Sequence, residues 1–275
     1  MSALTATIEG IGFWSNGLPD WDSARAFVRT GTLPDAAPAR PSPELLAPNE
    51  RRRAPETVAV ALDVALAACT RAGRAPADLP SVFASTHGDL GITDYMSATL
   101  VDNPRSVSPT RFHNSVHNAA AGYWTIGAGC TQATTAISAY AASFAEGLVE
   151  ALVQLDAGED AMLLVGYDGA ATGPLASVAK TSGLLGGALV LSRAPRNDAP
   201  RLRVEILEGN APVATGRLAM HAGRNAMAPM LPLFDALASG ESVATLHAGP
   251  GRMLRITLTQ GATMAAPEAA GVAHA

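Results

Sequence analysis

The chain has 275 residues, of which 48% are hydrophobic and 16% charged, so it is long enough to bury a core and too apolar for a disordered protein. Its 19 basic and 24 acidic residues give a formal net charge of -5, and the basic residues are scattered apart from the run Arg51–Arg53. This argues against nucleic acid as the main partner, because neutralising phosphates requires a basic surface.

The first elements expected are a strand and two helices. Thr7–Phe13 is a short apolar run followed by turn-forming residues, which predicts a strand that leads into a loop. A short helix is expected over Asp20–Thr30, and Leu33–Pro48, which contains five prolines, is expected to be an extended surface connection. In Pro55–Ala72 the apolar residues recur at helical spacing and a glycine follows, so this segment predicts a helix.

Strands and helices alternate through the middle of the chain, a pattern that predicts α/β layers. Two of the strands are nearly all apolar and are expected to be buried on both faces, whereas the last one alternates and turns one side to water. The expected strands are Ser81–Ser85, Thr134–Ser138, Met162–Val165, Gly187–Leu191 and Arg201–Leu207, and the expected helices are Asp94–Val101, Asn118–Gly127 and Ala142–Leu155.

The pattern weakens beyond Gly209. A helix over Ala228–Ser239 and a strand over Met253–Leu258 are expected there. Residues 261–275 are rich in alanine and have no periodicity, so they are expected to form a mobile tail.

Short glycine-bearing and apolar pieces between residues 5 and 208 stand in a characteristic order. They are Ile8–Gly12, Val107–Pro109 with Phe112, Asn118 with Ala121–Gly122, Ile137–Ala141, Met162–Gly166 and Gly187–Leu191. In order and spacing they resemble the N-terminal half of β-ketoacyl synthases. The resemblance implies a thiolase-like, layered α/β/α half-fold over residues 1–208, followed by a short divergent C-terminal extension over residues 209–260.

An active member of that family uses a cysteine at a helix N-terminus, which attacks an acyl thioester while backbone N–H groups hold the oxyanion. The cysteine ends a pattern such as I-S-T-A-C. Here the pattern reads Ile137-Ser138-Ala139-Tyr140-Ala141, so the resemblance places Ala141 at the nucleophile position. A shift of one residue would put Tyr140 or Ala142 there, and neither side chain is a thiol.

The family's two histidines and its lysine, which drive decarboxylation, lie in a second half that this chain does not match. His221 and His247 are the available histidines before residue 261 beyond the matched region. Neither lies in a glycine-rich, threonine-bearing motif of the family's kind, so both are interpreted as hydrogen-bonded or solvated loop residues. The resemblance therefore implies that the catalytic groups are missing.

A condensing-enzyme half without its nucleophile resembles the chain length factors, and most closely the short ketosynthase-like proteins of aryl polyene and related fatty-acid-like pathways. This implies a silent subunit that forms a heterodimer with an active ketosynthase and shapes the cavity in which an acyl chain grows on an acyl carrier protein. In the family the segment Ser108–Gly122 lies at the dimer interface. The expected contacts to the partner and its acyl cavity are Phe112, His113, Asn114, Val116, His117 and Asn118.

Two other functions stay open. The first is a free-standing acyltransferase or condensing enzyme that uses Cys130, although a nucleophilic thiol needs a helix N-terminus or a cation to lower its pKa, and Cys130 stands among glycines before a strand. The second is a non-catalytic module that binds an acyl chain or acts as a scaffold. Cys69 lies on the apolar stripe of a helix and is expected in the core.

Metal and cofactor sites are not expected. His113 and His117 are four residues apart, but no third ligand is close in sequence except Asp89 and Asp94. The glycine-rich run Gly183–Gly187 lacks the spacing and the lysine of nucleotide-binding loops, and no G-x-S-x-G elbow occurs. Two cysteines cannot form a disulfide framework, and no leader-like or spanning apolar segment is present, so a cytoplasmic protein without membrane insertion is expected.

Overall fold

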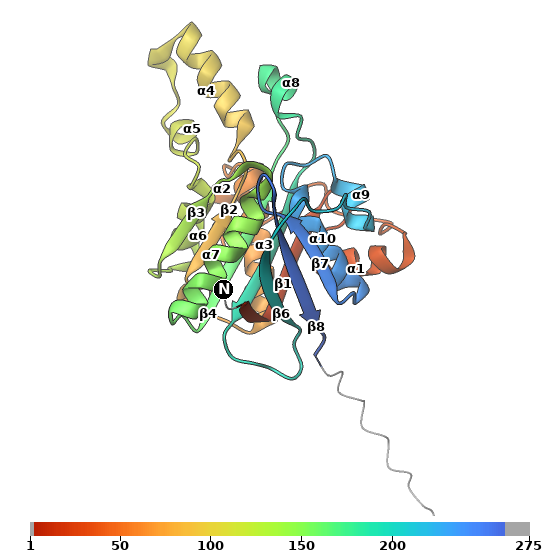
Figure 1. The fold of residues 1–275 in the computed structure, drawn as a ribbon. Coiled ribbons are helices and arrows are strands. Elements are labelled where there is room, and N and C mark those ends of the chain that lie inside the picture. Colours follow the sequence, from red (N-terminus) through yellow and green to blue (C-terminus); the bar gives the residue numbers. More distant parts are fainter. Residues whose placement is uncertain (1–2, 262–275) are drawn as a thin grey trace, which may run out of the picture.

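The protein, described here from a computed structural model over residues 3–261, is built on one mixed sheet in the order β3-β2-β4-β5-β1-β6-β8-β7, with helices on both faces (Figure 1). Strand β2 runs parallel to β3 and β4, and the remaining neighbours are antiparallel. The strands are β1 (Leu4–Ser15), β2 (Ser81–Ala84), β3 (Thr134–Ile137), β4 (Ala161–Asp168), β5 (Leu185–Ser192), β6 (Arg201–Glu208), β7 (Val243–His247) and β8 (Arg252–Thr259).

The helices are mostly short, and among the described residues none is both long and apolar enough to span a bilayer. The α-helices are α1 (Trp21–Thr30), α2 (Pro48–Arg51), α3 (Glu56–Ala72), α4 (Leu90–Asp102), α5 (Pro109–His113), α6 (Ala119–Ala128), α7 (Ser143–Ala157), α8 (Ala176–Ala179), α9 (Arg217–Ala222) and α10 (Leu231–Ser239). The 3-10 turns are η1 (Pro76–Asp78), η2 (Pro104–Ser106), η3 (Tyr140–Ala142), η4 (Gly173–Leu175) and η5 (Ala228–Met230).

Two hydrophobic cores lie on opposite faces of the sheet. Helices α3 and α6 cover one face, and α1, α7 and α10 pack in the core of the other. The second core contains Phe13, Trp21, Phe144 and Phe234, whose neighbouring rings lie 5.6 to 6.3 Å apart in tilted or edge-on geometry. At the opposite edge of the sheet from β3, strand β7 packs against α10, η3 and η5.

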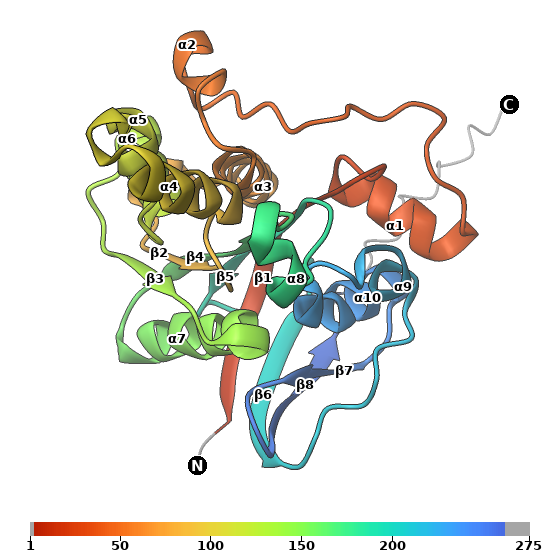
Figure 2. The ribbon, with the colours of Figure 1, turned by 90° about the horizontal axis from the view of Figure 1, so that it is seen from above.

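Most strands and helices predicted from periodicity are present. The apolar strands β4 and β5 are fully buried, and β6 alternates as expected, with Leu202 and Val204 buried and Arg201 and Arg203 exposed. The proline-rich segment forms a wide extended arc between α1 and α2 (Figure 2). Of the predicted tail, residues 262–275 lie outside the described residues.

The structure differs from the predicted elements in three places. Helix α4 begins four residues before the expected Asp94, because the Asp89 carboxylate caps it by accepting a hydrogen bond from the Ile92 N–H at 2.8 Å. Residues Pro109–His113 form helix α5, for which no element was predicted, and the Ser108 side chain caps it by accepting from the Arg111 N–H. Strand β7 was missed because its five residues carry too weak a pattern to stand out from a loop.

Backbone contact between β1 and α3 depends on two glycines. A Cβ atom at Gly10 would lie 2.1 Å from the Ala68 carbonyl oxygen, and one at Gly12 would lie 1.9 Å from the Val64 carbonyl oxygen. Both distances are far below van der Waals contact. Packing therefore explains the glycines of the motif Ile8–Gly12, because only glycine lets α3 lie so close to the strand.

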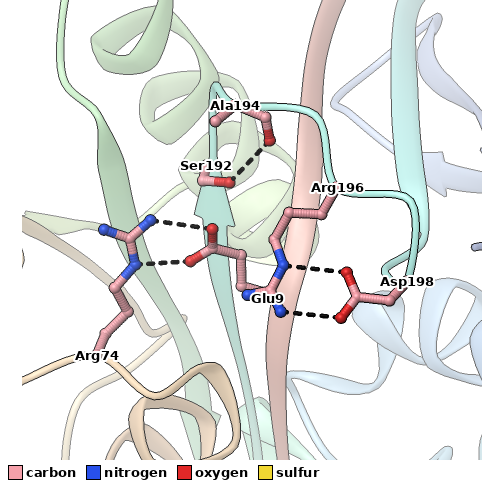
Figure 3. Close-up of polar contacts among 6 residues, drawn as sticks. All are labelled: Glu9, Arg74, Ser192, Ala194, Arg196 and Asp198. Carbon is pink, nitrogen blue, oxygen red and sulfur yellow. Dashed lines mark hydrogen bonds and ion pairs between the residues drawn. The ribbon is translucent and has the colours of Figure 1, made fainter.

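Glu9 lies in a bulge of β1 and ties that strand to the end of α3 (Figure 3). Its side chain is 3% exposed, and its carboxylate accepts hydrogen bonds from Arg74 Nε at 2.7 Å and Nη2 at 2.9 Å. Burial acts to raise the pKa of Glu9, but the hydrogen bonds and the charge of Arg74, together with the nearby Ser192 hydroxyl and the charge of Arg196, outweigh it. The pKa of Glu9 is therefore held below its ordinary value.

We expect Glu9→Gln to lower the free energy of unfolding at pH 7 by about 2 kcal/mol, because it removes a charge-assisted bidentate pair. A carboxyl whose folded pKa is lowered stabilises the fold above its unfolded pKa, and this stabilisation is lost as the pH falls through the folded value. The difference in the free energy of unfolding between wild type and Glu9→Gln should therefore shrink as the pH is lowered from about 5 to about 3. Urea unfolding at several pH values in this range measures the difference. A difference that does not change with pH would contradict the lowered pKa of Glu9.

Candidate functional site

The predicted nucleophile position lies in a strand–turn–helix unit formed by β3, η3 and α7. Ala141 is the middle residue of turn η3 and is exposed, while Ala142 is buried at the start of α7. The turn is fixed by hydrogen bonds. The Ser143 hydroxyl accepts from the Ala139 N–H at 2.9 Å and donates to the Tyr140 carbonyl at 2.6 Å. This unit has the shape that presents a nucleophile at a helix N-terminus, but the side chain at Ala141 is a methyl group.

Tyr140 has the unusual backbone of this turn. Its φ is +50°, and its side chain is 81% exposed. A bulky side chain in the left-handed region is strained by about 1 to 2 kcal/mol. The sequence places Tyr140 next to the predicted nucleophile position, Ala141, but no sequence pattern predicts the positive φ of Tyr140.

A buried carboxylate behind the turn was missed by sequence reasoning. Asp168, at the end of β4, is 1% exposed and accepts hydrogen bonds from Ser85 Oγ and the Thr86 N–H at 2.8 Å each and from the His87 N–H at 3.2 Å. Burial raises the pKa of Asp168, although these hydrogen bonds act in the opposite direction. Because every partner is a donor, Asp168 holds the loop after β2. The sequence feature that could have pointed to this site is the single acidic residue at the end of the apolar strand β4.

The two cysteines lie away from η3. Cys130 is 6% exposed, directly follows the C-terminal cap of α6, and has its Sγ 3.6 Å from the Leu79 carbonyl oxygen. A helix C-terminus carries partial negative charge and does not favour a thiolate. Cys69 lies in the core as predicted, where burial raises the pKa of its thiol to about 12. Neither location suits an attacking thiolate.

The two predicted histidines differ in position. His221 has its Nε2 atom 2.8 Å from the Asn16 carbonyl oxygen, and its ring lies 5.3 Å from that of Phe27, on the side of α1. His247 ends β7, and this strand packs against η3. The fold therefore brings the strand of His247, but not His221, toward the turn that carries Ala141.

The predicted interface segment is divided between surface and interior. Phe112 and Val116 are exposed, as are His113 and Asn118, whereas Asn114 is buried. His117 is half-buried, and its Nε2 atom lies 2.9 Å from the Ser85 carbonyl oxygen. The segment thus offers an exposed outer side, while Asn114 is buried and the contact of His117 with Ser85 fixes the inner side to the body.

Helices α4 and α5 form an arm that projects from the body (Figure 1). Only Ile92 of α4 is fully buried, and the Arg111 guanidinium lies 4.1 Å from the Tyr95 ring centre, which holds α5 against α4. The exposed large apolar side chains of the arm and the residues just after it are Leu100, Val101, Phe112 and Val116. An apolar arm of this kind is typical of a surface that another chain covers.

Strand β3 forms one edge of the sheet and, among residues 3–261, is paired only with β2. It lies on the same side of the molecule as α5 and α6 in both views (Figures 1 and 2). An unpaired edge offers a row of backbone donors and acceptors to a further strand. We use the name partner face for β3, the α4–α5 arm and residues 112–118.

A cavity of about 690 Å³ lies under the arm. Its lining includes Arg53 and Arg111, the carboxylate of Asp89, and the side chains of Thr57 and Asn114. The Asp89 carboxylate already accepts a hydrogen bond from the Thr57 hydroxyl at 2.7 Å. No group of three or more His, Cys, Asp or Glu side chains within residues 3–261 is arranged to hold a metal ion.

A family model described as β-ketoacyl synthase, N-terminal domain, matches residues 22–251. The chain belongs to this β-ketoacyl synthase family. No curated protein sequence matches it significantly. The match covers most of the chain, including the turn with Ala141 and the partner face.

Solved structures of similar fold include several complexes. One is a ketosynthase (ApeO) in complex with its chain length factor (ApeC) from Xenorhabdus doucetiae, with 24% identity, a TM-score of 0.73, and coverage of 92% of this chain and 99% of the other. The ishigamide ketosynthase/chain length factor has 16% identity and a TM-score of 0.72, with coverage of 94% and 99%. AntDE:AntF, a type II acyl-carrier protein in complex with its ketosynthase, has 12% identity and the same TM-score and coverage. The likeness establishes the thiolase-like ketosynthase fold.

Proposed function

We propose that this protein is a catalytically silent, chain-length-factor-like subunit that pairs with an active β-ketoacyl synthase. The observation that carries the proposal is that turn η3, Tyr140–Ala142, which the resemblance compares with the family's nucleophile turn, contains no thiol. An alanine cannot form the acyl thioester on which condensation depends. The solved complexes of ketosynthases with chain length factors support a ketosynthase as the partner.

The partner face is the surface proposed for this pairing. It combines an open strand edge with an apolar arm, and such an edge can be extended by a strand of another chain. Obligate interfaces bury about 2,000 Å² or more and are apolar at their centre. In this proposal Phe112 and Val116 contact the ketosynthase near its acyl cavity, His113 and Asn118 flank them, and the inward-facing Asn114 and His117 support the loop.

The wider role follows from the partner. The ketosynthase condenses acyl units carried on an acyl carrier protein, and this subunit shapes the cavity for the growing chain. The proposed setting is a cytoplasmic pathway of the aryl polyene or fatty-acid-like type, in which the acyl carrier protein meets this chain through the complex. No cofactor is needed for such a role.

The test is to co-express the chain with its proposed partner ketosynthase and to treat the complex with an acyl-carrier thioester. We expect a stable one-to-one complex in which intact-mass analysis finds the acyl adduct on the ketosynthase and none on this chain, because this chain offers no activated nucleophile. Stoichiometric acylation of this chain that disappears in Cys130→Ser would overturn the proposal and favour a free-standing acyltransferase.

The surface is tested in the same complex by Val116→Glu. A carboxylate buried against an apolar partner is costly, so affinity should fall at least about tenfold. The matched control is Val213→Glu, because Val213 is also exposed but lies on the loop between β6 and α9, away from the partner face (Figure 2). Equal affinity of the two variants would remove the support for this face.

A further inference from the structure

Two residues other than glycine have a positive φ in the part of the chain that the structure describes, Tyr140 at +50° and Lys180 at +46°. Lys180 follows the last residue of α8, where a left-handed residue is an ordinary way to end a helix. Tyr140 does not end a helix. It opens turn η3 directly after the sheet edge, and its backbone conformation is rare for a bulky side chain.

The strained backbone of Tyr140 is held from two sides. Its carbonyl oxygen accepts hydrogen bonds from Ser143 Oγ at 2.6 Å and from Thr86 Oγ1 at 3.3 Å. These donors come from the start of α7 and from the loop after β2, and Asp168 fixes that loop. The conformation is therefore imposed by several elements of the fold, which is how strain persists at functional positions.

The side chain gains nothing within the chain from this arrangement. It is 81% exposed, does not line the cavity described above, and has no aromatic ring partner within residues 3–261. Thr134, Ala136 and Ser138 are exposed in alternation along the same edge, and Tyr140 continues this series. A tyrosine offers a large, rigid, amphipathic surface and is enriched among residues that dominate interfaces.

We propose that Tyr140 is an anchor presented by turn η3 to the ketosynthase subunit, where its ring fills an apolar pocket beside the strand that pairs with β3. The inference rests on the proposed function and gives Tyr140, which the family motif contains, a role in binding that the resemblance did not assign. The partner that contacts Tyr140 is inferred from the position of this residue, which lies three residues after the end of β3. A strand that paired with the open edge of β3 would lie only about 4.8 Å from it. A chain that extends the sheet at β3 therefore lies within reach of the ring.

The test separates strain from binding by using Tyr140→Gly and Tyr140→Phe, with Lys180→Gly as the matched control. Glycine relieves the backbone at either position, so both glycine variants should raise the Tm of the isolated chain by about 2 °C. Only Tyr140→Gly should weaken binding to the ketosynthase, by at least about tenfold, whereas Tyr140→Phe keeps the ring and should stay within about threefold of wild type. Calorimetry and titration with the purified ketosynthase measure both quantities.

The outcomes are distinguishable. If the wild-type chain does not bind the ketosynthase, the proposed function fails and this inference fails with it. If the wild type binds and Tyr140→Gly binds equally well, only the role of Tyr140 is overturned. If the wild type instead self-associates and Tyr140→Gly abolishes this, the occupant is a second copy of the chain and the assignment to the ketosynthase is wrong.

Discussion

Gly12→Ala is expected to prevent the native packing of α3 against β1. The added Cβ atom would lie 1.9 Å from the Val64 carbonyl oxygen and 2.8 Å from the carbonyl carbon of the same residue, both of them backbone atoms that no rotamer change can move. The helix would have to shift as a whole and open the core around Trp14. We expect a loss on the order of 4 kcal/mol in the free energy of unfolding, a large part of the total for a domain of this kind.

Gly122→Ala is the matched control for this result. Gly122 lies inside α6, and a Cβ atom there would have no atom within 4 Å. The alanine should raise the free energy of unfolding by about 0.5 to 1 kcal/mol, because it restricts the unfolded chain and favours the helix. Urea unfolding compares the two variants. A Gly12→Ala protein with the wild-type midpoint would show that the close approach of α3 is not required.

Asp168→Ala is the second substitution expected to have a large effect. It would leave the Thr86 N–H, the His87 N–H and the Ser85 hydroxyl without their acceptor in a buried site. We expect a loss of about 3 to 5 kcal/mol, since unsatisfied buried donors retain the full cost of losing water. The free energy of unfolding from urea titration is the measurement.

Asp168→Asn and Asp198→Ala sharpen this result. An amide in place of the carboxylate turns one acceptor into a donor that faces other donors, so Asp168→Asn should also destabilise, but less than the alanine variant. Asp198 is an exposed acid that pairs with Arg196 on the surface, and its replacement should leave the unfolding midpoint unchanged. Similar midpoints for Asp168→Ala and Asp198→Ala would show that the Asp168 network does not hold the loop.

The fold was predictable where periodicity is strong and contacts are local. Helices α3 and α7 and strands β4 and β5 carry long patterns of buried apolar residues, and these patterns survive in the structure. Strand β7 and helix α9 are short and owe their form to neighbours, so their own residues gave little signal. Helix α4 began early because of a single capping side chain at Asp89.

The candidate site was predictable only in part for the same reason. The motif around Ala141 located the turn, because its residues are consecutive in sequence. The network of Asp168 joins residues more than 80 positions apart, and the positive φ of Tyr140 depends on donors from two other segments. Burial of Asn114 and the inward contact of His117 likewise arise from the docking of the arm, which no local pattern encodes.

The central place of β1 in the sheet sets the order in which the chain can fold. Strand β1 precedes its two neighbours by almost 200 residues and pairs with β5 and β6, for example Thr7 with Ser192 and Leu4 with Val204. At about 5 to 20 residues per second a ribosome needs roughly 10 to 40 s to make these partners, and until then an apolar strand has no neighbour. Contacts so distant in sequence also slow folding, because a long loop must close before they form. The native pairing of β1 should therefore appear late, only after β5 and β6 have left the ribosome.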